Sequence, residues 1–245
     1  MSIYNKVRRA VAKRIVNRKL PLNLSEAIVT FTFDDVPDSG MEEGMRILNT
    51  FGYKGTYYVA LSFYDHNRTD GMQFNPKYLK QVVDGGGELA CHTYNHIHFY
   101  QSGKAQIRED LDKNRQRMQE CIEGLSFTNF SYPYGEQTIT AKQAVKNRFK
   151  TARGVNSGIN HGVIDLINLR AYQLGEQMRM QDVYNLIDEA IRLKGWLIFF
   201  THDVENKPSI YGCTPAMLEG AAAYCKEKQV KVLTMDQAAN AIGAR

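Results

Sequence analysis

The sequence predicts a single-domain α/β fold, a distorted (β/α) barrel of about seven strands. Short β-rich segments alternate with amphipathic helical segments from about residue 27 to residue 236, which is typical of a mostly parallel sheet with helices outside it. The length of 245 residues suits one such barrel. Hydrophobic residues make up 43% and charged residues 23%, the balance of a globular domain. An open doubly wound sheet is the alternative.

The expected elements follow from residue patterns along the chain. Strands are expected where short β-rich apolar runs occur, at residues 27–33, 55–61, 88–91, 128–131, 196–201 and 230–233. Helices are expected where apolar residues recur every three or four positions, at residues 41–51, 75–83, 107–125, 138–147, 183–191 and 215–229. Gly195 is the expected C-cap of the fifth of these helices, and Thr214 followed by Pro215 begins the last one.

The first 24 residues form a basic arm that precedes a body of residues 25–245. Residues 1–20 carry seven lysines and arginines and no acid, while the whole chain is only +5, so the body is slightly acidic. This distribution does not indicate nucleic-acid binding, which needs cations spread over the folded surface. Five apolar residues of the arm recur at helical spacing: Ile3, Tyr4, Val7, Val11 and Ile15. A basic amphipathic helix of this kind predicts peripheral contact with an anionic membrane; a solvated arm or a helix packed on the body are alternatives.

The cysteines and the N-terminal pattern predict a cytoplasmic protein, with the basic arm at the inner face of the membrane. The four cysteines show no C-x-x-C spacing, and the first residues lack the apolar segment of a secretory signal. Reduced thiols are therefore expected. The sequence does not indicate an oligomeric state.

Polar residues follow four of the expected strands, where the reactive groups of parallel α/β folds gather. They are Asp34-Asp35, His92 to His96, Tyr132 to Gly135, and His202-Asp203. On a helical turn, His92 and His96 would share one face and, with one carboxylate, would form a two-histidine, one-aspartate metal site. Neighbouring aspartates point apart, so two separate roles are expected for them. Asp38 and Ser39 are the expected caps of the next helix.

In this order, four motifs resemble those of the polysaccharide deacetylase (NodB-homology) family, carbohydrate esterase family four. They are TFDD at residues 32–35, HTYNH at 92–96, FSYPYG at 130–135, and the apolar run WLIFFTH at 196–202. The resemblance covers about residues 27–236. It implies a deacetylase domain at 25–245 that removes an acetyl group from an N-acetylated sugar or glycan precursor.

The resemblance also implies a role for each matching residue. Asp35, His92 and His96 would hold one divalent metal ion, with Zn²⁺ expected and Co, Ni, Mn or Fe as alternatives. Asp34 would be the general base, the backbone N–H of Tyr134 would bind the oxyanion, and His202 would be the general acid. Tyr132 and Pro133 of the third motif are expected beside the substrate or behind the site.

Two departures from the family pattern need a replacement residue. Ser131 stands where many members carry an arginine beside the catalytic aspartate; Arg153 or Arg170 is expected to replace that charge. The family's fourth motif is not recognisable, so Asp165 or Asp182 is a candidate for orienting His202. Trp196, the single tryptophan, is expected in the core.

Three functions remain open at this point. The first is deacetylation of a sugar or glycan precursor, which the basic arm suggests is lipid-linked. The second is hydrolysis of another C–N bond, such as that of a cyclic imide or amide. The third is a non-catalytic glycan-binding protein with a relic site.

Overall fold

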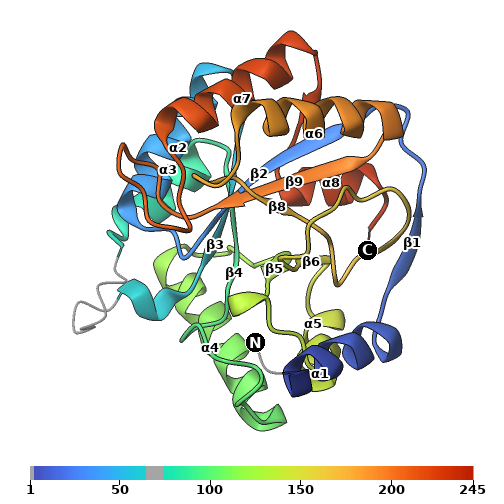
Figure 1. The fold of residues 1–245 in the computed structure, drawn as a ribbon. Helices are drawn as coiled ribbons and strands as arrows, with labels where there is room; N and C mark the ends of the chain where they lie inside the picture. Colours follow the sequence, from blue (N-terminus) through green and yellow to red (C-terminus); the bar gives the residue numbers. More distant parts are fainter. Residues whose placement is uncertain (1–2, 65–73, 245) are drawn as a thin grey trace.

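A curled sheet of parallel strands forms the centre of the molecule. The computed structural model describes residues 3–64 and 74–244 (Figure 1). Along the sheet the strands follow the order β6 (Thr151–Arg153), β5 (Asn129–Ser131), β4 (Glu88–Cys91), β3 (Thr56–Val59), β2 (Ile28–Asp34), β9 (Trp196–Thr201) and β8 (Tyr172–Gln173). The first residues of β2 also pair with β10 (Lys231–Val232). All of these pairs are parallel, which confirms the predicted α/β class and distorted barrel.

The segment that precedes β8, residues 166–171, curls the sheet back toward its other edge. Leu169 forms a parallel bridge with Arg153 of β6, and the chain then continues into β8 beside β9. Every residue of β2 and β9 is buried, as expected for strands covered on both faces. Trp196 is fully buried and donates its indole N–H to Thr30 Oγ1 at 2.9 Å, so it is a core residue.

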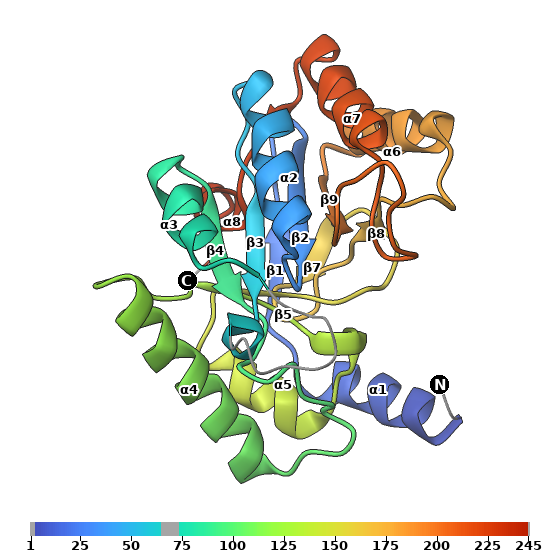
Figure 2. The ribbon, with the colours of Figure 1, turned by 90° about the vertical axis from the view of Figure 1, so that its left-hand side faces the viewer.

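Helices flank the strands on the outside of the sheet (Figure 2). They are α2 (Asp38–Thr50), α3 (Lys77–Asp84), α4 (Lys104–Cys121), α5 (Ile139–Lys146), α6 (Met180–Leu193), α7 (Pro215–Glu227) and α8 (Met235–Ala241). The 3₁₀ turns η1 (Leu61–Tyr64) and η2 (Pro133–Gly135) follow β3 and β5. Within the described ranges, no helix has both the length and the hydropathy that a membrane span needs.

The basic arm is folded onto the body. It forms α1 (Ile3–Ile15), which packs on α5, and β1 (Lys19–Leu22), which pairs antiparallel with β7 (Gly162–Asp165). Val7, Val11 and Ile15 are exposed on α1, whereas Ala12 and Val16 are buried. The apolar stripe therefore faces away from the body. The side chains of Ile3 and Tyr4, also expected on it, lie outside the described part of the chain.

Two predicted helix ends were wrong. Helix α2 begins at Asp38 with Pro37 as its N-cap, so Asp38 and Ser39 lie inside the first turn; Asp38 Oδ1 accepts the N–H of Asn75 at 2.6 Å. Helix α6 ends at Leu193, and its C-cap is Lys194, in the left-handed conformation (φ 48°), rather than Gly195. Gly195 is required for packing instead, because a Cβ there would lie 2.6 Å from Ile159 Cγ2.

The patterns missed the short strands β6 and β8. β6 and β8 have three and two residues, too few to show a period, and both contain polar residues. β6 nevertheless matters for function, because it carries Arg153.

Candidate active site and metal centre

A cleft of about 570 Å³ opens where β2, β4, β5 and β9 end. Its lining includes residues from each of the four predicted strand ends: Asp34, Asp35, His92, His96, Tyr132, Tyr134, Gly135, His202 and Asp203. The parallel sheet thus brings together side chains that are far apart in sequence.

Backbone conformation sets the geometry of this cleft. Five non-glycine residues with positive φ surround it: Asp35, Val36, Thr93, His96 and Tyr134. Such conformations cost about 1–3 kcal/mol each and persist only where the surrounding structure holds them. At the end of β2 the backbone turns at Asp35 and Val36, so the carboxylates of Asp34 and Asp35 point in different directions.

One of these carboxylates, that of Asp35, meets two imidazoles. Asp35 Oδ1 lies 3.5 Å from His92 Nε2 and 3.3 Å from His96 Nε2. The ligand atoms of the three residues lie within 4.8 Å of one another. This set of two imidazole nitrogens and one carboxylate suits a divalent metal such as zinc and leaves positions open for water or substrate.

The two histidines are brought together by a loop, so the prediction of a helical turn was wrong. Residues 92–96 are not helical, and Thr93 and His96 have φ of 65° and 52°. Asp110 of α4 holds this loop: its carboxylate accepts the backbone N–H groups of Tyr94 and Asn95 at 2.6 and 3.1 Å. No sequence motif pointed to Asp110.

The imidazoles are in the form that a metal ligand requires. His92 Nδ1 lies 2.8 Å from the carbonyl oxygen of Ser131, which can only accept, so Nδ1 carries the proton and Nε2 offers its lone pair. Burial lowers the pKa of His92 to about 4 and that of His96 to about 2. Both rings are therefore neutral at pH 7.

The second carboxylate, that of Asp34, contacts Arg153. The buried Arg153 guanidinium touches both oxygens of Asp34, and its Nη2 also donates to Ser131 Oγ at 2.6 Å. Ser131 and Arg153 are direct neighbours across β5 and β6, so the small serine leaves room for the arginine to reach past it. Arg170, the other candidate, is exposed and does not line the cleft; its backbone bonds to Asn160.

Opposing effects act on the ionisation of Asp34. Burial alone would raise its pKa, but the positive charge of Arg153, together with the nearby His92 and His202, gives a net lowering. Asp34 is therefore a carboxylate at neutral pH, as a general base must be.

Tyr134 lies in a tight turn whose backbone is fixed by hydrogen bonds. In η2 it has φ 55°, and hydrogen bonds from Gly135 N to Tyr132 O (2.9 Å) and from Glu136 N to Pro133 O (3.0 Å) fix the backbone. Its ring stacks on His98, with ring centroids 3.8 Å apart. The half-exposed ring of His98 lies beside the cleft, with Nδ1 3.1 Å from Glu136 Oε1.

The remaining residues of this motif take supporting positions. Tyr132 lines the cleft, but its hydroxyl donates to the carbonyl of Ile167 at 3.1 Å. Pro133 is buried at the start of the turn. These contacts fit a role behind the site rather than direct contact with substrate.

His202 lines the same cleft as Tyr134. Its Nε2 is 3.7 Å from Asp35 Oδ2, and its Nδ1 is 3.3 Å from the carbonyl oxygen of Tyr211. Burial lowers the pKa of His202. Neither predicted partner reaches it: Asp165 binds Lys142 and the backbone of Arg18, and Asp182 caps α6 with Arg179. The Tyr211 carbonyl takes their place.

Comparison with known proteins extends these observations. A family model described as polysaccharide deacetylase matches residues 22–149. A peptidoglycan-N-acetylglucosamine deacetylase from Bacillus cereus is 28% identical over 88 residues, 36% of this chain and 38% of that protein. The alignments with the two curated relatives cover only 38% and 14% of the relatives' own lengths, far less than two thirds.

Solved structures share the fold at low identity. The family 4 acetyl xylan esterase from Clostridium thermocellum, in complex with a cobalt ion, has a TM-score of 0.65 at 18% identity, covering 89% of this chain and 93% of that one. A wild-type CE4 family pseudoenzyme from Bacillus anthracis has a TM-score of 0.62 at 13% identity, covering 89% and 66%. With a family model matching more than half of its residues, the chain belongs to the polysaccharide deacetylase family.

Proposed function

We propose that this protein is a metal-dependent hydrolase that removes the acetyl group from an N-acetylated sugar or glycan precursor. One observation carries the proposal: the Asp34–Arg153 pair adjoins the cluster of Asp35, His92 and His96 in one cleft. Family membership supports deacetylation, and the name of the Bacillus cereus relative supports an N-acetylglucosamine unit.

The donor set fits a divalent ion, most simply Zn²⁺, held by Asp35, His92 and His96; Co, Ni, Mn or Fe accept the same ligands. When bound, such an ion supplies a Lewis acid for the acetyl carbonyl and lowers the pKa of water toward about 7. The protein's part is to keep both imidazoles neutral and to orient His92 through the Ser131 carbonyl.

Asp34 takes the proton of the attacking water. Arg153 serves this step in two ways: its charge keeps Asp34 ionised, and its contacts with both oxygens fix the direction of the carboxylate. A positioned general base typically contributes a factor of about 10² to 10⁴ in rate.

Tyr134 and His202 complete the reaction. The backbone N–H of Tyr134 donates to the developing oxyanion, and the loss of one such donor typically costs about 3 kcal/mol. His202, oriented by the Tyr211 carbonyl, gives a proton to the amine nitrogen as the C–N bond breaks. Because burial lowers its pKa, the resting ring is mostly neutral at pH 7; once it has taken up the proton that Asp34 removes from the water, it is a strong donor to the amine.

The test is the release of acetate from N-acetylglucosamine oligomers by the metal-loaded protein. Wild type is expected to release acetate, and Asp34→Asn to lose at least about 100-fold in kcat. Asp182→Asn, a surface cap on α6, is the matched control and is expected to retain activity.

Two other outcomes would contradict the proposal. Ring opening of cyclic imides without acetate release would assign the site to a different C–N bond. Full metal content with no hydrolysis of any acylated sugar would indicate a glycan-binding protein, as the existence of a pseudoenzyme with this fold illustrates.

A further inference from the structure

Helix α1 presents an apolar stripe to solvent. Val7, Val11 and Ile15 recur every four residues on one face and are 56%, 39% and 63% exposed. An amphipathic helix packed on a globular body ordinarily turns its apolar side inward. Here that side is turned outward.

The opposite side of α1 is fixed to the body by other residues. Ala12 and Val16 are buried beside α5. Arg8 Nη1 donates to the carbonyl of Tyr100 at 3.0 Å, and Arg9 Nη2 donates to Asn156 Oδ1 at 2.6 Å. These anchors set the rotation of the helix, so the exposed stripe follows from the packing.

Exposed cations lie beside the stripe. By helical periodicity Arg14 lies next to it on α1, and both Arg14 and Lys19, which follows the helix, are exposed. Residues 1–20 contain no acid that would neutralise this face. Apolar residues flanked by lysine and arginine are the pattern of helices that lie in the surface of an anionic bilayer.

We propose that the outward face of α1, the stripe Val7, Val11 and Ile15 with its flanking cations, docks onto an anionic lipid bilayer. Charge complementarity selects this occupant, because a second copy of the chain would bring another +7 segment against the first. The apolar side chains enter the boundary between headgroups and acyl chains, and the cations contact lipid phosphates.

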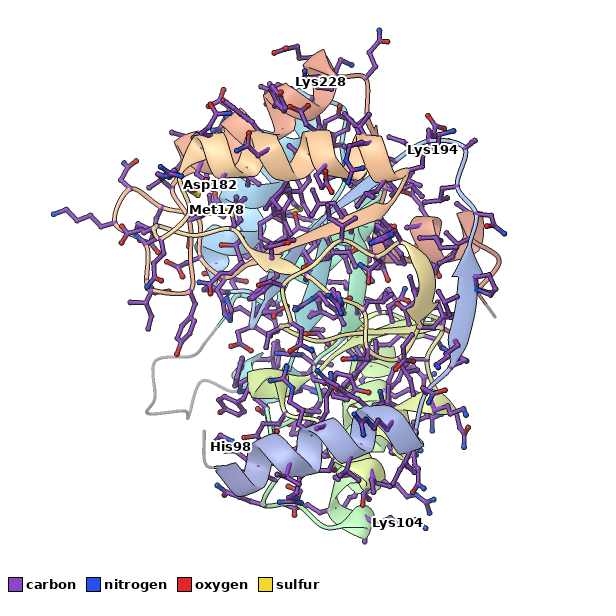
Figure 3. All side chains as sticks on the ribbon, turned by 45° about the vertical axis from the view of Figure 1, so that its right-hand side comes forward. His98, Lys104, Met178, Asp182, Lys194 and Lys228 are labelled. Atoms are coloured by element: carbon purple, nitrogen blue, oxygen red, sulfur yellow. The ribbon has the colours of Figure 1, made fainter. Side chains whose placement is uncertain are left out.

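This orientation has a consequence for the cleft, which rests on the proposed function. Tyr100, held by Arg8, donates its backbone N–H to Glu136 Oε2 at 3.0 Å, and Glu136 also binds His98 beside Tyr134. In the view of Figure 3, His98 is labelled near the N-terminal end of α1, and Arg8 of α1 bonds to the carbonyl of Tyr100, two residues farther along the chain. Asn156, held by Arg9, follows Val155, which lines the cleft. Docked α1 would therefore hold the cleft near the headgroups, which suits an acetylated glycan attached to a lipid.

The test is co-sedimentation of the full chain with vesicles. Wild type is expected to bind vesicles made of equal parts phosphatidylcholine and phosphatidylglycerol, and to bind phosphatidylcholine alone at least about tenfold more weakly. Val7→Ser/Val11→Ser/Ile15→Ser and, separately, Arg14→Glu are each expected to weaken binding to the anionic vesicles at least about tenfold.

Matched controls lie on other helices. Ile191→Ser on α6 and Arg108→Glu on α4 change an exposed apolar residue and an exposed arginine away from α1, and both should bind as wild type does. Unchanged thermal unfolding of the triple variant would show that it folds. Equal binding to both vesicle compositions, binding unaffected by the triple variant, or a dimer that the triple variant dissolves would each overturn the proposal.

Hydrolysis of soluble N-acetylglucosamine oligomers separates this proposal from the proposed function. The triple variant should retain that activity in full. Vesicle binding without acetate release from any substrate would refute the proposed function and leave membrane docking standing.

Discussion

The guanidinium of Arg153, on β6, contacts both carboxylate oxygens of Asp34, on β2, across the interior of the curled sheet. The guanidinium also lies against the aromatic rings of Tyr58 and Phe200, whose ring centroids are 5.1 and 4.8 Å from its central carbon. The pair is almost completely buried. Ser131 cannot supply a positive charge beside Asp34, and Arg153 supplies it from the adjacent strand.

Arg153→Met should destabilise the protein and reduce its activity. It leaves the buried Asp34 carboxylate without its cation, which typically costs about 3–5 kcal/mol in the free energy of unfolding. Acetate release should fall at least about 100-fold, because the base loses its orientation and part of its ionisation. Chemical denaturation and acetate assays measure the two effects.

Two further variants separate charge pairing from general damage. Arg170→Ala, exposed and away from the cleft, should behave as wild type. Moving the arginine to the neighbouring strand, as Ser131→Arg/Arg153→Ser, should regain part of the activity that Arg153→Ser loses, because the two positions face each other across β5 and β6. If Arg170→Ala were as damaging as Arg153→Met, the assignment of Arg153 would be wrong.

Gly135→Ala should reduce activity through the turn that holds Tyr134. Gly135 has φ +62°, and a Cβ there would lie 2.3 Å from Val155 Cγ2, so the turn must shift. We expect a fall of at least about tenfold in kcat, since displacement of an oxyanion donor costs several kcal/mol. Gly124→Ala shares the positive φ but meets nothing within 4 Å, and should cost only about 1–2 kcal/mol of stability with full activity. Equal activity loss in both variants would count against this role of the turn.

Glu88 predicts a pH dependence of stability at the end of the sheet away from the cleft. Its carboxylate accepts hydrogen bonds from Thr56, Asn129 and the backbone of Asp236, but burial raises its pKa from 4.5 to about 6. The folded protein therefore holds this proton more tightly than the unfolded chain does. The Glu88 contribution to the free energy of unfolding falls by at most about 2 kcal/mol as the pH rises from about 4.5 to about 6. Above that range the contribution is constant.

Comparison with Glu88→Gln isolates this contribution. The difference in unfolding free energy between wild type and the variant should shift by up to about 2 kcal/mol in favour of the variant between pH 4 and pH 7. Urea unfolding at both pH values measures it. A difference that does not change with pH would show that Glu88 has an ordinary pKa.

The sequence could predict the strand-end residues because their chemistry is local. An apolar strand followed by Asp34-Asp35, and another followed by His202, can be recognised without coordinates, and parallel topology then places such ends at one edge. His92 and His96 were expected together for the wrong local reason: a loop with two positive φ angles joins them, and only the fold shows that Asp110 holds this loop.

Register and short strands were beyond sequence patterns. The choice between Arg153 and Arg170 depends on which residue faces Ser131, and β6 is too short to reveal its pairing. The Tyr211 carbonyl beside His202 could not be found because every residue carries a carbonyl; its position depends on the path of a loop. The outward turn of the α1 stripe likewise follows from the anchors Arg8 and Arg9, which sequence spacing does not distinguish from other cations.

The most direct test of the central claim is the metal content of the purified protein after loading with Zn²⁺ and removal of excess ion. We expect one ion per chain in wild type and in Asp34→Asn, the latter without acetate release. His92→Ala and Asp35→Ala should lose the ion, while His161→Ala, an exposed histidine, should keep it. A wild type that retains no ion, or a His92→Ala variant that retains as much as wild type, would contradict the account.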